Sequence, residues 1–575
     1  MHQSLTATAV GAIAGNKKIQ GLEEALFGDC DEGRGMDMTA AGMADTTEDA
    51  GTLHRAIDWK GAFWVASGVP ALVLFSIGGV AGNVGALTFL VWALSMVMGF
   101  IQSFTYAEIA GLFPNKSGGA SIYGAAAWLP YSKLIAPLSV WCNWFAWSPV
   151  LSLGCSIAAA YIINAYAPAP DAAIHSWSLL TYHFGPIGFS LNAAFFIGGA
   201  LMLIVFAIQH RGIMGTASVQ KWIGLMVIVP MTIVGVVPII TGQVHLSNFF
   251  PVLPLAAAGA PALGTWNIAG WTLTLGGMFI AAWSTYGFET AVCYTSEFRN
   301  PEKDTFKAIF YSGLLCLALF TLVPFAFQGV LGVSGMLAGP ISDGSGVAEA
   351  LAGMVGGGKL VTGILVILMI LALLLSIMTA MAGSSRTLYQ GSVDGWLPRY
   401  LSFVNDHGAP TRAMWTDLIV NLAVLSIACA DTASFFFILA VSNCGYIIFN
   451  FLNLNSGWIH RIDSGHVHRP YRAPTWLLAA GSIFAFINAA FMGAGAKVWN
   501  PAALWAGFIT AALIIPVFLY RHYVQDGGKF PHEMMEDLHV GDARSVSKKK
   551  AGILPYLALI GGIAVVLIAN AIFLV

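Results

Sequence analysis

Apolar runs of about 18 or more residues recur along most of this chain, and they constrain its fold more than any other feature. A helical run of that length matches the hydrocarbon thickness of a bilayer. The composition agrees, because 57% of the residues are hydrophobic and only 9% are charged, whereas soluble domains average about 25% charged residues. We therefore expect an all-α integral membrane protein, with the lipid bilayer as its main partner.

The apolar runs predict twelve core spans and a thirteenth near the C-terminus. The spans are expected near residues 62–83, 86–112, 133–165, 190–209, 217–241, 268–293, 305–335, 359–390, 414–431, 432–458, 475–494, 501–520 and 552–574. The corresponding parts of the chain are an N-terminal tail, the twelve-span core, a loop and an extra transmembrane helix, at residues 1–58, 59–521, 522–551 and 552–575.

The basic residues fall almost entirely on one side of this predicted topology. With the N-terminus in the cytoplasm, 24 of the 26 Lys and Arg residues lie in cytoplasmic segments, and only Lys359 and Lys497 fall outside. Membrane proteins keep their Lys and Arg residues on the cytoplasmic side. The distribution therefore predicts a multi-pass protein of the cell membrane with a cytoplasmic N-terminus.

The segments outside the spans carry weaker signals. Residues 1–58 hold ten acidic residues against four Lys or Arg, so we expect a largely disordered tail with one short helix near residues 22–27. The Gly-rich loop 336–358 is expected outside the cell, either as a packed re-entrant or lid segment or as a flexible linker. The seven cysteines lie mostly in apolar runs without metal-ligand spacing, so we expect no disulfide framework, metal or cofactor.

The sixth predicted span contains polar chemistry that a plain membrane helix would not need. Ser284, Thr285 and Gly287 stand together, and Glu289 follows inside the apolar run. A carboxyl group inside a span costs a few kcal/mol or more, which makes Glu289 a functional candidate. The Ser-Thr-x-Gly cluster is a place where the helix could unwind toward a ligand. The alternative is a structural Glu that forms a hydrogen bond with a neighbouring helix.

The first predicted span is interrupted as well, by Gly68 and Pro70. Proline lacks an N–H group and disturbs the preceding helical turn, and glycine tolerates unwound backbone. The first and sixth spans are equivalent positions in two five-helix halves that enter the membrane from opposite faces. A matched pair of interrupted spans indicates the substrate site of an inverted-repeat transporter. The alternative is that Gly and Pro are simply frequent in membrane helices.

Four stretches, in order between residues 60 and 520, resemble permeases of the amino acid–polyamine–organocation superfamily. They read EIAGLFP (108–114) with SGGASIY (117–123), YGFE (286–289) with EFRNPEK (297–303), SRTLY (385–389) with DGWLP (394–398), and GAP (408–410). The resemblance implies a LeuT-like fold of two inverted five-helix halves, at about 62–241 and 268–458, followed by two more core spans. It also implies transport of an amino acid or related small amine by alternating access.

The resemblance further implies roles for individual residues. Backbone N–H groups of the first span would hold a substrate carboxylate, although Ser-Gly-Val-Pro stands where the family usually has a Gly-x-Gly-like stretch. Carbonyl groups of the sixth span would accept from the substrate amine. In this scheme Trp283 is a gate and Glu289 is a proton-coupling group. The implied binding residues are Ala66, Ser67, Gly68 and Val69 in the first span, and Ala282, Trp283, Ser284 and Thr285 in the sixth.

Third-span and tenth-span residues are expected to line the same cavity, with ordinary packing as the alternative role. They are Asn143, Trp144, Trp147, Asn443 and Tyr446. Some proton-coupled relatives place a Lys in the fifth span, and our alignment puts Val227 at that position, so this device is expected to be absent.

Other functions are less consistent with the sequence. A polyamine or other organic-cation permease or exchanger would need several cavity carboxylates, but Glu108, Asp417 and Asp431 are expected near span ends. A channel would show a repeated pore loop or charged ring, and a receptor a soluble output domain. A membrane enzyme would need convergent nucleophiles or metal ligands, and no nucleotide-binding motif indicates ATP-driven transport. We expect a small-molecule substrate and no nucleic-acid partner.

Overall fold

The computed structural model describes residues 53, 55–169, 171–184, 187–537 and 550–573. The predictions for the acidic tail, including its short helix, fall almost wholly outside these residues. Within the described part of the chain, nine helical stretches are long and apolar enough to cross a membrane. This confirms a multi-pass, mainly helical membrane protein, while the count of thirteen spans stays a prediction.

The predicted first half of the core begins with an interrupted helix and continues through four further predicted spans. Its elements are α2 (Trp59–Ala66), η1 (Val69–Leu72), α3 (Val73–Val84), η2 (Gly85–Leu87), α4 (Thr88–Ala110), α5 (Ala120–Trp128), α6 (Ile135–Trp147), α7 (Val150–Tyr166), α8 (Ala173–Ser176), β1 (Ser178–Phe184), β2 (Ile187–Asn192), α9 (Ala193–Gln209) and α10 (Gly212–Ile240).

The second half also begins with an interrupted helix, after the short turn η3 (Leu246–Phe249). Its elements are α11 (Ile268–Thr285), η4 (Gly287–Glu297), α12 (Pro301–Met336), α13 (Gly339–Ser342), α14 (Val347–Gly353), α15 (Gly358–Val393), η5 (Arg399–Ser402), α16 (Thr411–Ala428) and α17 (Thr432–Asp463). The C-terminal elements are α18 (Thr475–Trp499), α19 (Ala503–Ala512), α20 (Ile514–Leu519), the π-helical turn η6 (Tyr520–Gln525), α21 (His532–Asp537) and α22 (Leu554–Ile572).

The interruption of the first span has a local cause. The Asp58 carboxylate caps α2 by accepting from the Gly61 N–H at 2.9 Å. The helix ends at Ala66 because Pro70 has no N–H to donate to the Ala66 carbonyl, and a proline ring clashes with the carbonyl four residues before it. The chain then continues as the 3₁₀ turn η1 before α3 begins. The interruption therefore lies where Gly68 and Pro70 predicted it.

The sixth span is interrupted at Tyr286, where α11 gives way to the 3₁₀ segment η4. Gly287 begins that segment and packs closely against the third span. A Cβ atom built at Gly287 would lie 2.7 Å from the Trp147 ring. Thr285 Oγ1 donates to the Ala281 carbonyl at 2.8 Å, and its pairing with Ser95 joins the end of α11 to α4 at 2.8 Å. The cluster at 284–287 thus marks a true break in the α-helix.

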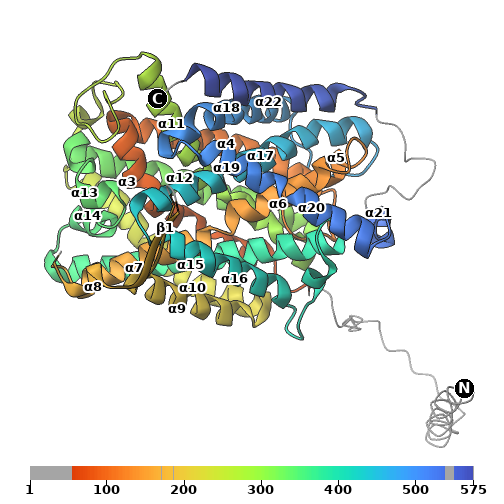
Figure 1. Cartoon of the computed structure of the whole chain (residues 1–575), viewed down its shortest axis with the longest axis horizontal. Coiled ribbons are helices and arrows are strands. Elements are labelled where there is room, and N and C mark those ends of the chain that lie inside the picture. Colours follow the sequence, from red (N-terminus) through yellow and green to blue (C-terminus); the bar gives the residue numbers. More distant parts are fainter. Residues whose placement is uncertain (1–52, 54, 170, 185–186, 538–549, 574–575) are drawn as a thin grey trace, which may run out of the picture. The chain divides into compact units, whose positions relative to one another are not determined.

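The helices pack side by side, with α4 against α12, α7 against α15, α6 against α17 and α18 against α22. In Figure 1, α8, α13 and α14 gather at one end of these helices, and α5 and α21 lie at the other. This separation matches the predicted division into outside and cytoplasmic loops. We call the end with α5 and α21 the predicted cytoplasmic end.

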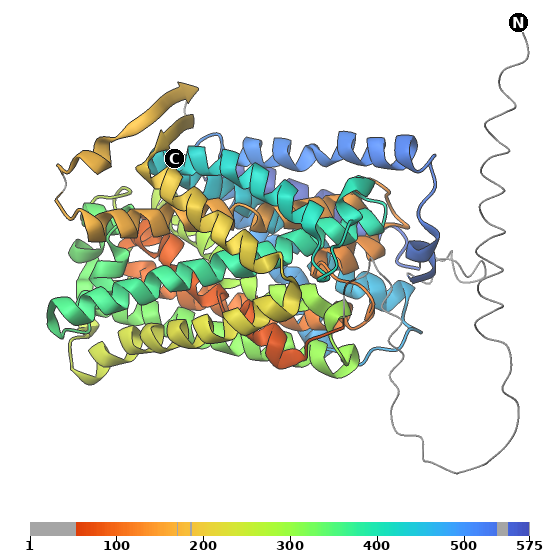
Figure 2. The same ribbon diagram turned by 90° about the horizontal axis from the view of Figure 1, so that it is seen from below.

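Two features of the opposite end differ from a simple loop. The segment 336–358 forms α13 and α14, which bury Val347 and Leu351, and its Ile341 carbonyl approaches so close to Gly78 that a Cβ atom there would lie 1.7 Å away. The packed alternative is therefore correct and the flexible linker is wrong. In addition, β1 and β2 form an antiparallel hairpin that projects at one edge of the helices (Figure 2), a departure from the all-α expectation.

The orientation can be tested by labelling two exposed positions. Ser176 ends α8 and His466 follows α17, so single cysteines there should react without disturbing the fold. In intact cells, an impermeant thiol reagent should label position 176 and spare position 466 in a variant without the native cysteines. Permeabilised cells should show both labels. The reverse pattern in intact cells would overturn the predicted orientation.

Candidate functional site

The two interrupted spans meet in the interior of the protein. Ser76 of α3 and Ser284 of α11 share a hydrogen bond of 2.9 Å between their hydroxyl oxygens, and both side chains are buried. Phe75 contacts Trp283 edge to face, with ring centroids 5.9 Å apart. A Cβ atom at Gly287 would lie 3.1 Å from a Val69 methyl group. The breaks that the sequence predicted separately therefore form one region.

A cavity of about 10 Å³ lies at this meeting point. Its walls come from η1, from the end of α6 and the start of α7, from η4 and from α15. Every lining residue is buried, so the cavity lies in the interior of the protein. The lining residues are Val69, Leu72, Trp147, Val150, Thr290, Ser376, Thr379 and Ala380. The cavity has room for about one water molecule, so helices must move before a larger molecule can enter.

Glu289 lies beside this cavity and is only 2% exposed. Its Oε1 accepts a hydrogen bond of 3.0 Å from Trp147 Nε1. Its Oε2 and the neighbouring Thr290 Oγ1 are buried without a hydrogen-bond partner among the residues that the structure describes. Buried polar atoms are nearly always paired, and unpaired ones call for an explanation such as a ligand or an exchangeable proton. A buried carboxyl group at a cavity is a candidate for proton exchange.

Three aromatic side chains form a cluster that includes one wall of the cavity. Trp147 stacks on Trp283 at a centroid separation of 6.1 Å and meets Tyr446 edge to face at 5.5 Å. Trp283 is fully buried, and its Nε1 donates to Ser442 Oγ and to the Ala146 carbonyl, each at 3.1 Å. The proposed gate residue thus bridges the sixth, third and tenth spans and adjoins the cavity through Trp147.

The other predicted binding residues occupy different surroundings. Val69 and Trp147 line the cavity, but Asn143 accepts from Thr387 at 2.9 Å toward the predicted cytoplasmic end. Asn443 donates to the Phe279 carbonyl on α11, and its Oδ1 has no partner among the described residues. Those not on the cavity wall are Ala66, Ser67, Gly68, Asn143, Ala282, Trp283, Ser284, Thr285, Asn443 and Tyr446.

Sequence reasoning missed a polar contact between the first span and α15. Thr379 Oγ1 donates to the Val65 carbonyl at 2.5 Å, and Ser376 Oγ donates to the Gly68 carbonyl at 2.6 Å. Both carbonyls lie at the interruption of the first span, where the regular helical bonds end. The signal in the sequence was a pair of hydroxyl residues spaced i, i+3 on one face of an apolar helix.

The fifth span takes part in this contact through Gln220. Its Nε2 donates to the Val65 carbonyl at 3.2 Å and to Thr379 Oγ1 at 3.3 Å. The fifth span therefore reaches the interruption of the first span through Gln220, and the alignment on Val227 stays a prediction.

Asp417 lies in the second turn of α16. It is fully buried in α16, and its Oδ1 accepts from Trp144 Nε1 at 2.9 Å and from Ser148 Oγ at 2.6 Å. Ser384 Oγ donates to the other carboxyl oxygen. Donors from the C-terminal end of α6 and from α15 surround the carboxyl group, which explains how it is tolerated inside the protein. Trp144 therefore serves this contact and does not reach the cavity.

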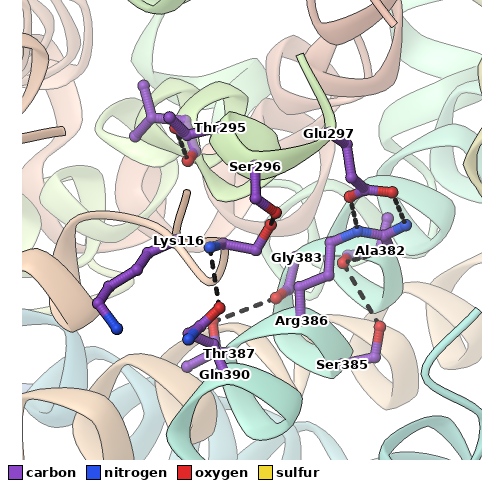
Figure 3. A network of polar contacts seen from close by, with 12 residues as sticks. Lys116, Thr295, Ser296, Glu297, Ala382, Gly383, Ser385, Arg386, Thr387 and Gln390 are labelled. Atoms are coloured by element: carbon purple, nitrogen blue, oxygen red, sulfur yellow. Dashed lines mark hydrogen bonds and ion pairs between the residues drawn. The ribbon is translucent and has the colours of Figure 1, made fainter. Parts of the chain in front are cut away.

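A buried ion pair closes the protein at the predicted cytoplasmic end (Figure 3). Arg386 of α15 donates two hydrogen bonds to the carboxylate of Glu297 at the end of η4. The bond from Nη2 to Oε1 measures 2.9 Å. The side chains of Arg386 and Glu297 are 4% and 0% exposed. The Arg386 guanidinium also lies 5.3 Å from the centre of the Tyr294 ring. A two-pronged Arg–carboxylate contact of this kind is strong and geometrically specific.

A second set of contacts surrounds this pair. Lys116 Nζ and Asp394 Oδ1 form a buried ion pair of 2.7 Å, and Gln390 joins it by donating to the same oxygen at 3.0 Å. Ser117 pairs with Ser296, and its N–H donates to Gln390 Oε1 at 3.1 Å (Figure 3). These contacts tie α15, η4 and the 115–119 loop together, which closes this end of the cavity.

Comparison with known proteins agrees with this architecture. A family model described as amino acid permease matches residues 57–515. A branched-chain amino acid permease of Bacillus subtilis is 25% identical over 417 residues, which cover 70% of this chain and 77% of the relative. An uncharacterised transporter of Legionella pneumophila is 25% identical over 330 residues, covering 55% of this chain and 61% of the relative.

The membrane helices, the buried interior site and these similarities define a membrane transporter and not an enzyme. More particularly, because the family match spans most of the chain, this protein belongs to the amino acid permease family, within the amino acid–polyamine–organocation superfamily.

Proposed function

We propose that this protein is a secondary active transporter that moves an amino acid or a related small amine by alternating access. The observation that carries the proposal is the meeting of two interrupted spans at a buried cavity. Interrupted helices in matched positions of two halves are the usual binding site of such transporters. The buried Arg386–Glu297 pair supplies a discrete contact that can break and re-form between two states.

The cavity wall favours a small aliphatic amino acid as the substrate. Its apolar part consists of Val69, Leu72, Val150 and Ala380, and hydroxyl groups occupy the remainder together with Trp147. The Bacillus relative is named as a branched-chain amino acid permease, which supports the same class. None of the described residues that line the cavity carries a carboxylate, so a polyamine, which carries several positive charges, is less well supported.

The substrate's charged groups would meet backbone at the two interruptions. We infer that N–H groups near 66–69, where the helix dipole gathers positive charge, hold the carboxylate. Carbonyl groups near 282–285 would accept from the amine. Glu289 would lie next to the bound molecule through Thr290 and Trp147, where its protonation can bias the inward-facing against the outward-facing state.

Transport by purified protein in vesicles tests the proposal. Labelled leucine, isoleucine and valine should accumulate in a protein-dependent manner, faster with an inward proton gradient than without it. Arginine and putrescine serve as matched cationic comparisons and should accumulate little. Protein-dependent uptake of putrescine with no uptake of any amino acid would contradict the proposed substrate class.

Glu289→Gln is expected to flatten the pH dependence of transport while substrate binding persists. Glutamine keeps the shape and the acceptor for Trp147 Nε1, but it cannot gain or lose a proton. A single titrating carboxyl group changes its ratio of charged to neutral forms tenfold per pH unit. The part of the pH dependence of uptake that comes from Glu289 should therefore be absent in the variant. The measurement is the initial rate of uptake across the acidic-to-neutral range.

Glu302→Gln is the matched control for this variant. Glu302 is exposed in the first turn of α12, so its loss should leave the profile unchanged. If Glu289→Gln keeps the wild-type profile as well, the proton-sensitive group is a different one, and the buried carboxyl group of Asp417 becomes the next residue to test.

A further inference from the structure

A second and larger cavity, of about 410 Å³, lies at the predicted cytoplasmic end, away from the substrate cavity. It is bounded by the end of α15, by η5 and by the segment from η6 to Pro531. Its charged lining residues are Arg399, Arg521, Lys529 and Asp526. Three positive charges thus face one negative charge, and the cavity carries a net positive charge that favours an anion.

The single carboxylate is already shared between two arginines. Arg399 donates from Nε and Nη2 to Asp526 Oδ1 at 3.0 and 2.7 Å, and Arg521 Nε donates to Asp526 Oδ2 at 2.7 Å. Asp526 therefore orients both guanidinium groups and neutralises only one of them. Lys529 is exposed and forms no ion pair with any residue that the structure describes.

Arg521 has an unused donor inside the protein. Its side chain is 4% exposed, and its Nη1 is buried with no hydrogen-bond acceptor in the described ranges of the chain. A buried, charged donor without an acceptor is costly, by about 1–3 kcal/mol or more. An anion in the adjoining cavity would provide the acceptor. Arginine is the residue best suited to phosphate, because its planar fork matches two phosphate oxygens.

The local backbone explains how Arg521 comes to face inward. It lies in η6, a π-helical turn at the end of the twelfth predicted span, and such turns are frequent at functional sites. Within this turn Arg521 and His522 are buried, whereas Tyr520 and Tyr523 are 51% and 60% exposed. Exposed tyrosines at the end of a membrane helix are typical of the headgroup region. The cavity is therefore expected at the depth of lipid phosphates.

We propose that this cavity binds a phosphate group, held by Arg521 and Lys529 and oriented through Arg399 and Asp526. The phosphate comes from the headgroup of an anionic phospholipid of the cytoplasmic leaflet or from free phosphate. A bound phosphate would connect the segment after α15 with the segment after α20, the two sides of the cavity. The proposal does not depend on which substrate the transporter carries.

Native mass spectrometry of the delipidated full-length protein tests this site. Added phosphatidylglycerol should be retained more strongly than phosphatidylcholine. Lys529→Gln should weaken retention about fivefold, the effect of removing one basic residue near an anionic headgroup. Arg521→Gln should weaken it more, because its contact is buried and charge-assisted. Arg472→Gln, at an exposed arginine of another loop, is the matched control and should retain phosphatidylglycerol normally.

A parallel titration with inorganic phosphate, read by thermal unfolding, distinguishes the two sources. Phosphate that stabilises the wild type and displaces phosphatidylglycerol supports a site for the lipid headgroup. Phosphate that stabilises the wild type when no lipid is retained supports free phosphate as the ligand. Either effect must be lost in the variants. If Arg521→Gln does not fold, the exposed Lys529→Gln decides the question, and equal binding by that variant and the wild type would overturn the proposal.

Discussion

Gly68→Ala is expected to abolish transport and to destabilise the protein, although it adds one methyl group. A Cβ atom at this position would lie 2.5 Å from the Leu375 carbonyl oxygen, 2.6 Å from its carbonyl carbon and 2.7 Å from Thr379 Oγ1. The carbonyl belongs to the regular helix α15 and cannot turn aside. Overpacking of this kind costs about 1–3 kcal/mol. Separating the first span from α15 would also stretch the hydrogen bonds from Ser376 and Thr379.

The measurements are thermal unfolding in detergent and amino acid uptake in vesicles. Gly363→Ala is the matched control, because Gly363 lies exposed in the same α15 helix and a Cβ atom there meets nothing within 4 Å. That variant should be neutral or more stable by about 0.5–1 kcal/mol, the usual gain for alanine in a helix interior. Wild-type stability and uptake in Gly68→Ala would show that the close approach to α15 is unnecessary.

Arg386→Gln is expected to give the largest loss of stability, about 3–5 kcal/mol, because it leaves a buried carboxylate without its cation. Glu297 has a side chain that is 0% exposed, so water cannot compensate. The predicted cytoplasmic end should open more readily. A cysteine at Thr290, on the cavity wall, should then react with a thiol reagent applied to inside-out vesicles.

A double variant that removes both charges distinguishes the cost of one unpaired buried charge from the effect of losing the contact that closes the site. The double variant Arg386→Met with Glu297→Gln should recover much of the stability, since neither charge is then left buried alone. Arg55→Gln is the control for a lost surface contact, because Arg55 is exposed and its side chain donates to Asn115 within the described part of the chain. It should change stability by less than about 1 kcal/mol. If Arg386→Gln unfolds at the wild-type temperature and still excludes the reagent, this pair does not close the site.

The interruptions of the two spans followed from local chemistry, and this is why the sequence predicted them. Pro70 acts on the carbonyl four residues before it, and the polar cluster at 284–287 marks the end of α11. Glu289 was identified for a similar reason, since a carboxyl group in an apolar run is conspicuous in any sequence. Each of these signals depends on residues within about one turn of one another.

The partners of these residues depended on contacts between distant parts of the chain. Nothing near Asn143 in the sequence shows that it meets Thr387, and nothing near Asp417 shows that Trp144 and Ser148 turn their donors toward it. Which fifth-span residue meets the Val65 carbonyl depends on how α10 is rotated and displaced against α2, a rigid-body property of the packed helices.

The sequence by itself therefore determined the membrane class, the family, the two helix breaks and the buried carboxyl group of Glu289, because apolar run length and local backbone chemistry are encoded in neighbouring residues. Tertiary structure alone decided which side chains line the cavity, that Gln220 reaches Val65, and that Arg386 pairs with Glu297 across 89 positions. These outcomes depend on the angles and separations at which helices pack, and periodicity within one helix does not specify them.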